Sequence, residues 1–231
     1  MKQSFLSNDR IYLRAVEPED MDVMYEMEND PSMWDISNFT VPYSRYVLRQ
    51  YIEGSQCDVF ADKQLRLMIM SKSDHRILGT IDITDFVPLH SRGEVGIAVH
   101  KDYRRQGYAS DALQLLCEYA FDFLSLTQLY AHVATDNEVC MKLFTSCGFV
   151  QCGLLKDWLQ VGGCYKDAAI FQYLNPAMLI LYFAVIYRVA PKAKEIIAVL
   201  CSVSGIFLVA THGNIHAMSI SPKGIIIGLL V

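Results

Sequence analysis

A strand, a polar turn and a helix follow one another without a break in residues 94–116, EVGIAVHKDYRRQGYASDALQLL. Val95, Ile97 and Val99 alternate with smaller or polar residues, as in a half-buried strand. Beyond Gly107, apolar residues recur at helical spacing. The segment therefore predicts an α/β (or α+β) domain in which a helix begins close to the end of a strand.

The corner at Gly107 suits a phosphate group. A helix start exposes backbone N–H groups without intrahelical partners, and the helix dipole adds partial positive charge there. Gly107 and Ala109 are small enough for close approach, and Arg104 and Arg105 add charge at the rim. An ordinary strand-turn-helix with solvated arginines explains the R-x-x-G-x-A pattern equally well, so the pattern alone decides nothing.

Its surroundings favour the phosphate site. Residues 104–109 (RRQGYA) resemble the R/Q-x-x-G-x-G/A pyrophosphate loop of the GCN5-related N-acetyltransferases (the GNAT family). Three further stretches resemble elements of that family in the right order: EVGIAVHKDYR, its fourth strand; residues 135–138 with Phe144, Gly148 and Phe149, its "DNE…A…Y…GF" element; and residues 12–15 with Glu17 and Asp20, its "LRPxxxxD" opening. The resemblance covers residues 11–174 and is nearest to spermidine and ribosomal-protein acetyltransferases.

The resemblance implies a fold, a donor and a set of binding residues. It implies a mixed, mostly antiparallel central sheet flanked by helices, with acetyl-CoA as acetyl donor. Backbone N–H groups of the fourth strand would hold the acyl carbonyl where that strand splays from the fifth. The implied cofactor-binding residues are Ile97, Ala98, Val99, Arg104, Arg105, Gln106, Gly107, Tyr108, Ala109 and Asn137. From its position alone, Asn137 equally predicts a helix N-cap.

Acetyl transfer to an amine also needs a proton acceptor. Glu94 and Asp82 are the candidates, because they lie on neighbouring predicted strands and a partly buried carboxylate can have a raised pKa. Either could instead bind a cationic substrate or be a solvated acid. His100 and His132 lie within strands and are predicted to be structural.

Phe144 is a departure from the family pattern. It stands where the family often has a tyrosine that protonates the departing thiolate, and phenylalanine cannot donate a proton. A coenzyme thiol with a pKa of about 8.5 could leave unprotonated at pH 7 for about 2 kcal/mol. We therefore expect an enzyme that works without this acid, not an inactive one.

Composition narrows the classes of partner. The first 174 residues hold 24 of the 25 acids and 16 of the 20 bases, a formal charge of −8 that favours a cationic substrate over nucleic acid. The seven cysteines form no C-x-x-C pair and no metal-ligand spacing with histidine, so we expect reduced thiols and no metal. The segment MKQSFLSNDR lacks the apolar region of a secretory signal, which predicts a cytoplasmic protein.

Periodicity and turn signals predict the remaining elements. Strands are expected at residues 10–15, 64–70, 76–86, 94–100, 128–134, 149–159 and 165–174, and helices at 17–29, 42–54, 107–124 and 138–147. In the helix at 42–54, Tyr46, Leu48 and Tyr51 are predicted to face inward.

The composition changes after residue 174, which predicts an acetyltransferase domain at 1–174 and a hydrophobic helical tail at 175–231. The apolar runs at 176–187, 196–211 and 224–231 are each shorter than a clear transmembrane helix, and the segment resembles a fragment of an EamA-like drug/metabolite transporter. By the positive-inside rule, a first run that spanned a membrane would place the domain away from cytosolic acetyl-CoA. A fused fragment without function, a hairpin that enters the membrane without spanning it, and a helical annex all stay open.

Two classes of function follow. The first is an acetyl-CoA-dependent N-acetyltransferase acting on a primary amine of a small polyamine or diamine such as spermidine, or, in a close variant, on the N-terminus of a ribosomal protein. The second is a non-catalytic acetyl-CoA-binding module or truncated transporter fusion that associates with a membrane through 175–231. Phe144 and the apolar tail favour the second. The sequence specifies neither the amine nor whether the chain forms a homo-oligomer.

Overall fold

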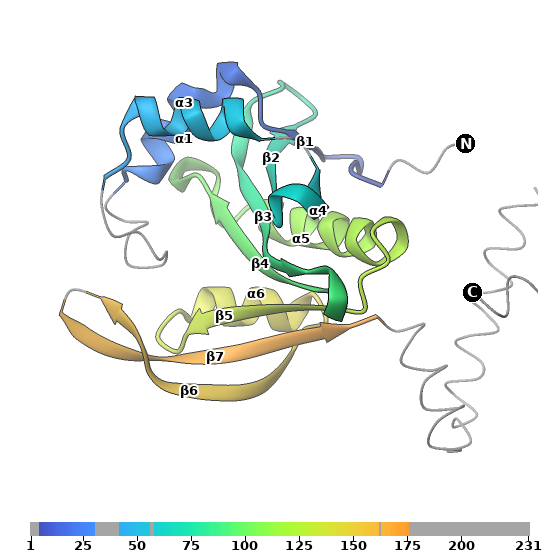
Figure 1. The fold of residues 1–231 in the computed structure, drawn as a ribbon, viewed down its shortest axis with the longest axis vertical. Helices are drawn as coiled ribbons and strands as arrows, with labels where there is room; N and C mark the ends of the chain where they lie inside the picture. The colour runs from blue at the N-terminus through green and yellow to red at the C-terminus, as the bar shows by residue number, and fades with distance from the viewer. Residues whose placement is uncertain (1–4, 31–41, 56–57, 162, 176–231) are drawn as a thin grey trace, which may run out of the picture. The chain divides into compact units, whose positions relative to one another are not determined.

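A single mixed sheet organises the chain. The computed structural model describes residues 5–30, 42–55, 58–161 and 163–175. Within them, seven strands form a sheet in the order β1-β2-β3-β4-β5-β7-β6 (Figure 1). The strands are β1 (Ile11–Ala15), β2 (Leu65–Ser71), β3 (Ile77–Val87), β4 (Arg92–Val99), β5 (Gln128–Ala134), β6 (Val150–Val161) and β7 (Cys164–Leu174). Every neighbouring pair is antiparallel except β4 and β5, which are parallel, so the predicted sheet is confirmed.

Helices cover both faces of this sheet. They are η1 (Pro18–Asp20), α1 (Met21–Glu28), α3 (Arg45–Gly54), α4 (Val59–Asp62), η2 (Pro88–His90), η3 (Lys101–Tyr103), α5 (Tyr108–Glu118), the π-helical turn η4 (Tyr119–Phe123) and α6 (Glu138–Ser146). Local signals set their ends. The Ser44 hydroxyl accepts a hydrogen bond from the Val47 N–H at the start of α3, and Gly148, with φ of 93°, follows α6.

The two faces have separate cores, and β2 belongs to both. Leu67 and Ile69 of β2 pack in the larger core, under α5, whereas Met68 and Met70 pack with Met24 and other residues of α1 and α3. Successive side chains of a strand point to opposite faces, so a strand covered on both sides must be apolar throughout. This explains why β2 reads as a nearly continuous apolar run.

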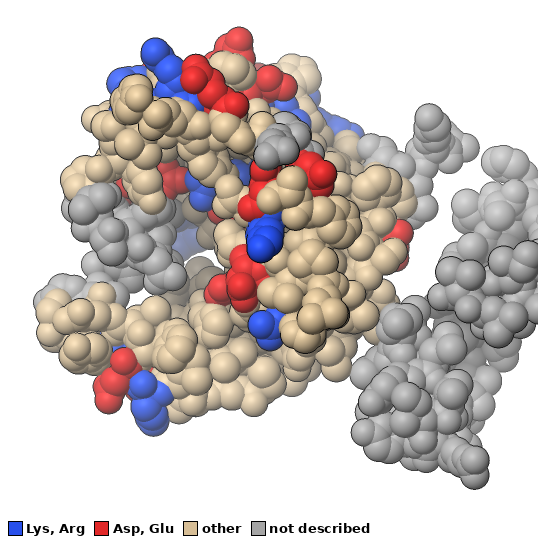
Figure 2. Space-filling model, viewed as in Figure 1, with Lys and Arg blue, Asp and Glu red and all other residues tan. Residues whose placement is uncertain are grey.

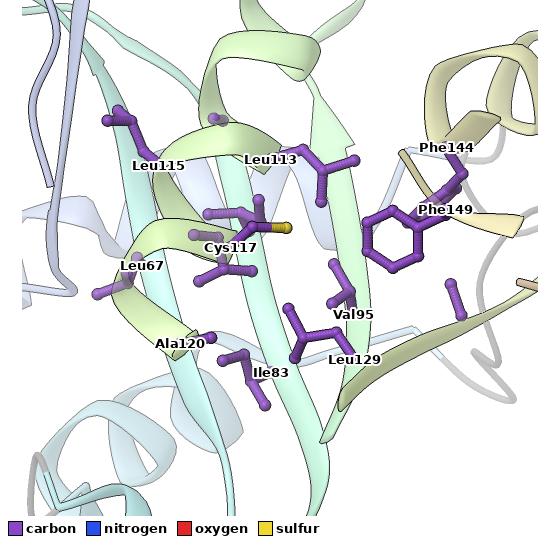
Figure 3. Packing of buried hydrophobic residues seen from close by; sticks show 14 of the residues in the cluster. Leu67, Ile83, Val95, Leu113, Leu115, Cys117, Ala120, Leu129, Phe144 and Phe149 are labelled. Atoms are coloured by element: carbon purple, nitrogen blue, oxygen red, sulfur yellow. The ribbon is translucent and has the colours of Figure 1, made fainter. Parts of the chain in front are cut away.

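The larger core fixes α5 against β4. Leu113 and Leu116 of α5 are completely buried, and Val95 of β4 is 4% exposed. Figure 3 shows Leu113 and Cys117 pointing from α5 toward the strands that carry Val95 and Leu129. Burying a leucine side chain contributes roughly 1.5–3 kcal/mol, so the position of α5, and of the corner at its start, is strongly determined.

Two details differ from the prediction. Tyr46 is 68% exposed, because α3 contacts the smaller core through Leu48 with Tyr51 and Ile52 beside it. The helix predicted to reach residue 124 leaves α-helical geometry after Glu118 and continues as a π-helical turn.

One predicted feature lies almost wholly outside the described residues. It is the hydrophobic tail at 175–231, of which only Asn175 is described. Among the residues that the structure does describe, no helix combines the length and hydropathy needed to cross a membrane.

Candidate active site

Strands β4 and β5 separate soon after they begin. The two ribbons diverge in Figure 1. Their parallel pairing is limited to three residue pairs, the last of which joins Glu94 to Tyr130. A cavity of about 590 Å³ opens beyond this point, lined by β4 and β5 and by residues of α1, β2, β3, α6 and β6. The space-filling view shows it as a hollow (Figure 2). The splay expected between the fourth and fifth strands is therefore present.

The backbone N–H groups of β4 alternate between the side of β3 and the side of this opening. The His100 N–H donates to a carbonyl oxygen of β3 at 2.8 Å, and N–H groups alternate in direction along a strand. By that alternation, the N–H groups of Ile97 and Val99 point to the β5 side and that of Ala98 points to β3. In agreement, the Val99 carbonyl oxygen accepts a hydrogen bond from Arg104 Nε at 3.0 Å instead of pairing with β3. Two of the three predicted donors thus face the cavity side.

The corner at the start of α5 is braced from behind by Arg10. Gly107 has φ of 85°, and no described side chain caps the helix. One Arg10 guanidinium nitrogen donates to the Gln106 carbonyl oxygen at 2.7 Å and the other to Asp111 Oδ2 at 2.8 Å. The guanidinium also lies over the Tyr108 ring, 4.8 Å from its centroid. These contacts hold the corner in a shape that leaves its N–H groups available to an anion.

The remaining residues of the predicted loop surround that corner. Arg104 and Arg105 are exposed, and Ala109 is half-buried in the first turn of α5. Arg105 has φ of 62°, in the left-handed region, which turns the chain sharply just before the helix. The arginines thus lie beside the helix start, as the phosphate-site interpretation requires.

Helix α6 supplies another wall of the cavity. The Asn137 side chain accepts a hydrogen bond from the Cys140 N–H at 3.1 Å, so the predicted N-cap is confirmed. Phe144 also lines the cavity but is only 2% exposed, with its ring packed on Phe149 and Phe171. Burial raises the pKa of the Cys140 thiol to about 11, so this group stays protonated at neutral pH.

Two carboxylates on the opposite wall share one arginine. Arg66 donates to both oxygens of Asp82, at 2.9 and 3.1 Å, and to Glu28 Oε1 at 2.7 Å. Burial opposes the charge of Arg66, but the two carboxylates outweigh it and raise the pKa of Arg66, which is permanently charged. Burial raises the pKa of Glu28, while the charge of Arg66 lowers it in part. Asp82 therefore lies on the cavity wall as half of a bidentate ion pair.

Glu94 has a different partner. Its Oε1 lies 2.7 Å from His132 Nδ1, across the point where β4 and β5 separate. The His132 ring stacks on Trp158 of β6, with centroids 6.1 Å apart, and contacts Tyr130 edge-on at 5.6 Å. Glu94, His132 and Trp158 all line the cavity. The predicted base candidate thus lies against a histidine that the sequence had assigned a structural role.

Comparison with known proteins decides the family. A family profile described as "Acetyltransferase (GNAT) domain" matches residues 10–150. The chain belongs to this family. The predicted family and enzyme class are therefore confirmed: the protein is a GNAT N-acetyltransferase, and acetyl-CoA is its acetyl donor. The roles of individual residues stay predictions.

Relatives of this acetyltransferase match about 70–75% of its chain. "Uncharacterized N-acetyltransferase p20" of Bacillus licheniformis is 28% identical over 170 residues, 74% of this chain and 96% of that protein. Spermidine N(1)-acetyltransferase of Vibrio cholerae is 24% identical over 160 residues, 69% of this chain and 90% of that protein. A crystal structure of the Vibrio enzyme in complex with CoA and spermine matches with a TM-score of 0.67 and 24% identity over 74% of this chain and 99% of that chain, which supports the fold. Another structure of that enzyme is described as dodecameric.

A further match concerns a transporter. A stretch of 62 residues is 36% identical to "Uncharacterized inner membrane transporter YicL" of Salmonella typhimurium, covering 27% of this chain and 21% of that protein. A match of that extent does not show a family. The resemblance of the tail to transporters stays a prediction about residues outside the described part of the acetyltransferase.

Sequence reasoning missed several residues around the site. Arg10, Arg66 and Trp158 drew no prediction, and His132 was assigned to the sheet. These residues belong to no common sequence motif, because each lies on a different strand or, for Arg10, just before one. Their only signal was that polar or aromatic side chains interrupt apolar patterns, which does not say where they meet.

Proposed function

We propose that this protein transfers the acetyl group of acetyl-CoA to a primary amine of a small polyamine or diamine. One observation carries the proposal. The strands β4 and β5 separate near a helix start whose free N–H groups suit a phosphate, and the cavity between the strands has carboxylates on its wall. A thioester and a cationic amine would meet in this opening.

The donor would enter along β4. The N–H groups at the Gly107 corner would bind the pyrophosphate of acetyl-CoA, with Arg104 and Arg105 adding charge. The N–H groups of Ile97 and Val99 would then face the pantetheine arm and the thioester carbonyl, whose oxygen gains negative charge during attack. Asn137 would meet the arm from the other wall.

The acceptor would lie against the acidic wall. Glu28, Asp82 and Glu94 line the cavity, and among its described lining residues only Arg66 and His132 offset them. Asp82 already accepts two hydrogen bonds from Arg66, so we assign it to cation binding rather than to proton transfer. Glu94 lies where the strands part, close to the position at which amine and thioester must meet. A polyamine suits this wall because its second ammonium group can form an ion pair with a carboxylate while its first amino group reacts.

The thiolate would depart without a tyrosine. Phe144 is buried among aromatic rings, and its side chain has no acidic proton to donate to the thiolate. The penalty of about 2 kcal/mol for releasing a free thiolate at pH 7 is small beside the roughly 7–11 kcal/mol that holding two reactants together can supply.

A thiol-release assay tests the proposal. Purified full-length protein is given acetyl-CoA and a panel of polyamines, diamines, ribosomal-protein N-terminal peptides and aminoglycosides. Because Cys152 and Cys164 are exposed free thiols, the signal of protein with acetyl-CoA but no amine must be subtracted. Saturable release with polyamines, and an amide confirmed by mass spectrometry, is the expected result.

The same panel decides between the alternatives. Release with peptides alone would favour the N-terminal acetyltransferase. Tight acetyl-CoA binding by calorimetry without release for any amine would favour a non-catalytic binding module. Association with membranes and assembly into homo-oligomers stay predictions, for which vesicle flotation and light scattering of the full-length chain are the direct measurements.

A further inference from the structure

A histidine and a carboxylate meet at the point where the sheet opens. Glu94 and Tyr130 form the last β4–β5 pair, and His132 is two residues further along β5. Its ring therefore stands at the edge of the cavity, with Nδ1 2.7 Å from Glu94 Oε1. His132 is about three-quarters buried and Glu94 slightly less so. A bond of this length between partly buried groups fixes the direction of the ring.

The other ring nitrogen is left for a ligand. Within the part of the chain that the structure describes, His132 Nε2 has no hydrogen-bond partner. Trp158 stacks on one face of the ring, and Tyr130 contacts it edge-on. The Tyr130 hydroxyl is itself held by Asp85, so the aromatic neighbours are fixed as well. The ring is clamped on several sides, and its Nε2 lies opposite the nitrogen bound to Glu94.

We propose that His132 is the group that takes the proton from the substrate ammonium, and that Glu94 positions it. The inference rests on the proposed acetyl transfer. Glu94, as carboxylate, accepts the Nδ1–H of neutral His132, which leaves a lone pair on Nε2. The carboxylate also stabilises the imidazolium that forms once Nε2 gains a proton. This division of roles follows the general logic of a base oriented by a carboxylate.

The reaction balances with these two residues. An ammonium group R–NH₃⁺ gives one proton to Nε2, and the free amine forms a bond from nitrogen to the thioester carbonyl carbon. The tetrahedral intermediate collapses, the C–S bond breaks and its electron pair leaves on sulfur. The nitrogen loses a second proton through solvent, the thiolate gains one, and the imidazolium returns its proton to water. The sum is R–NH₃⁺ and acetyl-CoA giving the acetamide, CoA–SH and one H⁺.

Substitutions distinguish this arrangement from one in which Glu94 is the base. Loss of a general base costs about 10²–10⁴-fold in rate, so we expect His132→Ala to lower kcat by at least about 100-fold. Added imidazole should restore part of this activity, because it can occupy the space of the deleted ring. Glu94→Gln should also lose activity, but imidazole should not restore it. A His90→Ala variant, whose side chain is exposed at the far end of β3 and outside the cavity, should keep wild-type rates.

Measurements other than turnover show whether a variant has lost activity merely because it no longer folds or binds acetyl-CoA. Acetyl-CoA affinity by calorimetry should stay within about threefold in both site variants. Nitrogen NMR of the wild type near pH 8 should show His132 with its proton on Nδ1. The inference is overturned if His132→Ala retains more than a tenth of wild-type kcat, if imidazole has no effect, or if the proton is on Nε2. A wild-type protein that releases no thiol with any amine would instead refute the proposed function.

Discussion

Replacing Arg66 by methionine should remove the charged partner that the buried carboxylates of Asp82 and Glu28 share. Arg66 makes three hydrogen bonds, two to Asp82 and one to Glu28, and its guanidinium lies 5.5 Å from the centroid of the Tyr51 ring. The Asp82 and Glu28 side chains are only 14% and 11% exposed. Methionine keeps most of the apolar stem but none of the charge. Two like charges would then face each other across the cavity wall.

The magnitude follows from this burial. Removing one partner of a buried ion pair typically costs 3–5 kcal/mol, and because Arg66 is itself 23% exposed we expect about 3 kcal/mol. The loss should depend on pH. Burial already raises the pKa of Glu28, and removing the opposing charge raises it further. A carboxyl group whose pKa is raised by folding stabilises the protein below its unfolded pKa and loses that contribution as pH rises. The deficit should therefore be largest at pH 7–8 and shrink toward pH 5.

Urea denaturation at pH 8, 7, 6 and 5 measures this. Lys142→Met is the matched control, because it removes an exposed ion pair with Glu138 and should cost less than about 1 kcal/mol at every pH. Adding Asp82→Asn to Arg66→Met should recover part of the loss at pH 7. A deficit below 1 kcal/mol, or one that does not change between pH 8 and pH 5, would refute the reasoning.

Three other substitutions give sharp outcomes. Phe144→Tyr should raise kcat by no more than about 30-fold at pH 7, the factor equivalent to 2 kcal/mol, and a thiol-release rate higher by several orders of magnitude would contradict an enzyme adapted to work without the acid. Arg10→Met should weaken acetyl-CoA binding roughly tenfold in calorimetry, because hydrogen bonds from a charged group are worth about 1.5–3 kcal/mol. The KM for the amine should stay unchanged. An equal change in acetyl-CoA affinity and in this KM would point to general unfolding. Gly79→Ala should lower the melting temperature severely, since its Cβ would lie 2.1 Å from the Ala98 carbonyl oxygen, whereas Gly54→Ala, whose Cβ meets nothing within 4 Å, should be harmless. Equal melting temperatures for the two glycine variants would contradict this.

Local sequence determined the helices and strands and the corner at Gly107. The turn from β4 into α5 is encoded within about fifteen consecutive residues, because a strand period, a glycine that adopts positive φ and a helical period each depend on near neighbours. The same is true of the Asn137 cap and of the hairpin between β6 and β7. For this reason the mixed, mostly antiparallel sheet implied by the family resemblance, and the helix start at Gly107, could be anticipated.

Only the tertiary structure decided which distant residues contact one another. His132 meets Glu94 because β5 pairs in parallel with β4 across a long connection, and Trp158 joins them from β6. Arg10 reaches the Gly107 corner from nearly a hundred residues away. Such contacts are set by register and packing between distant segments, which leave no periodic trace in the sequence. The helix start at Gly107 is thus predictable from local pattern, whereas the partners of Glu94 and Asp82 become visible only once the sheet is assembled.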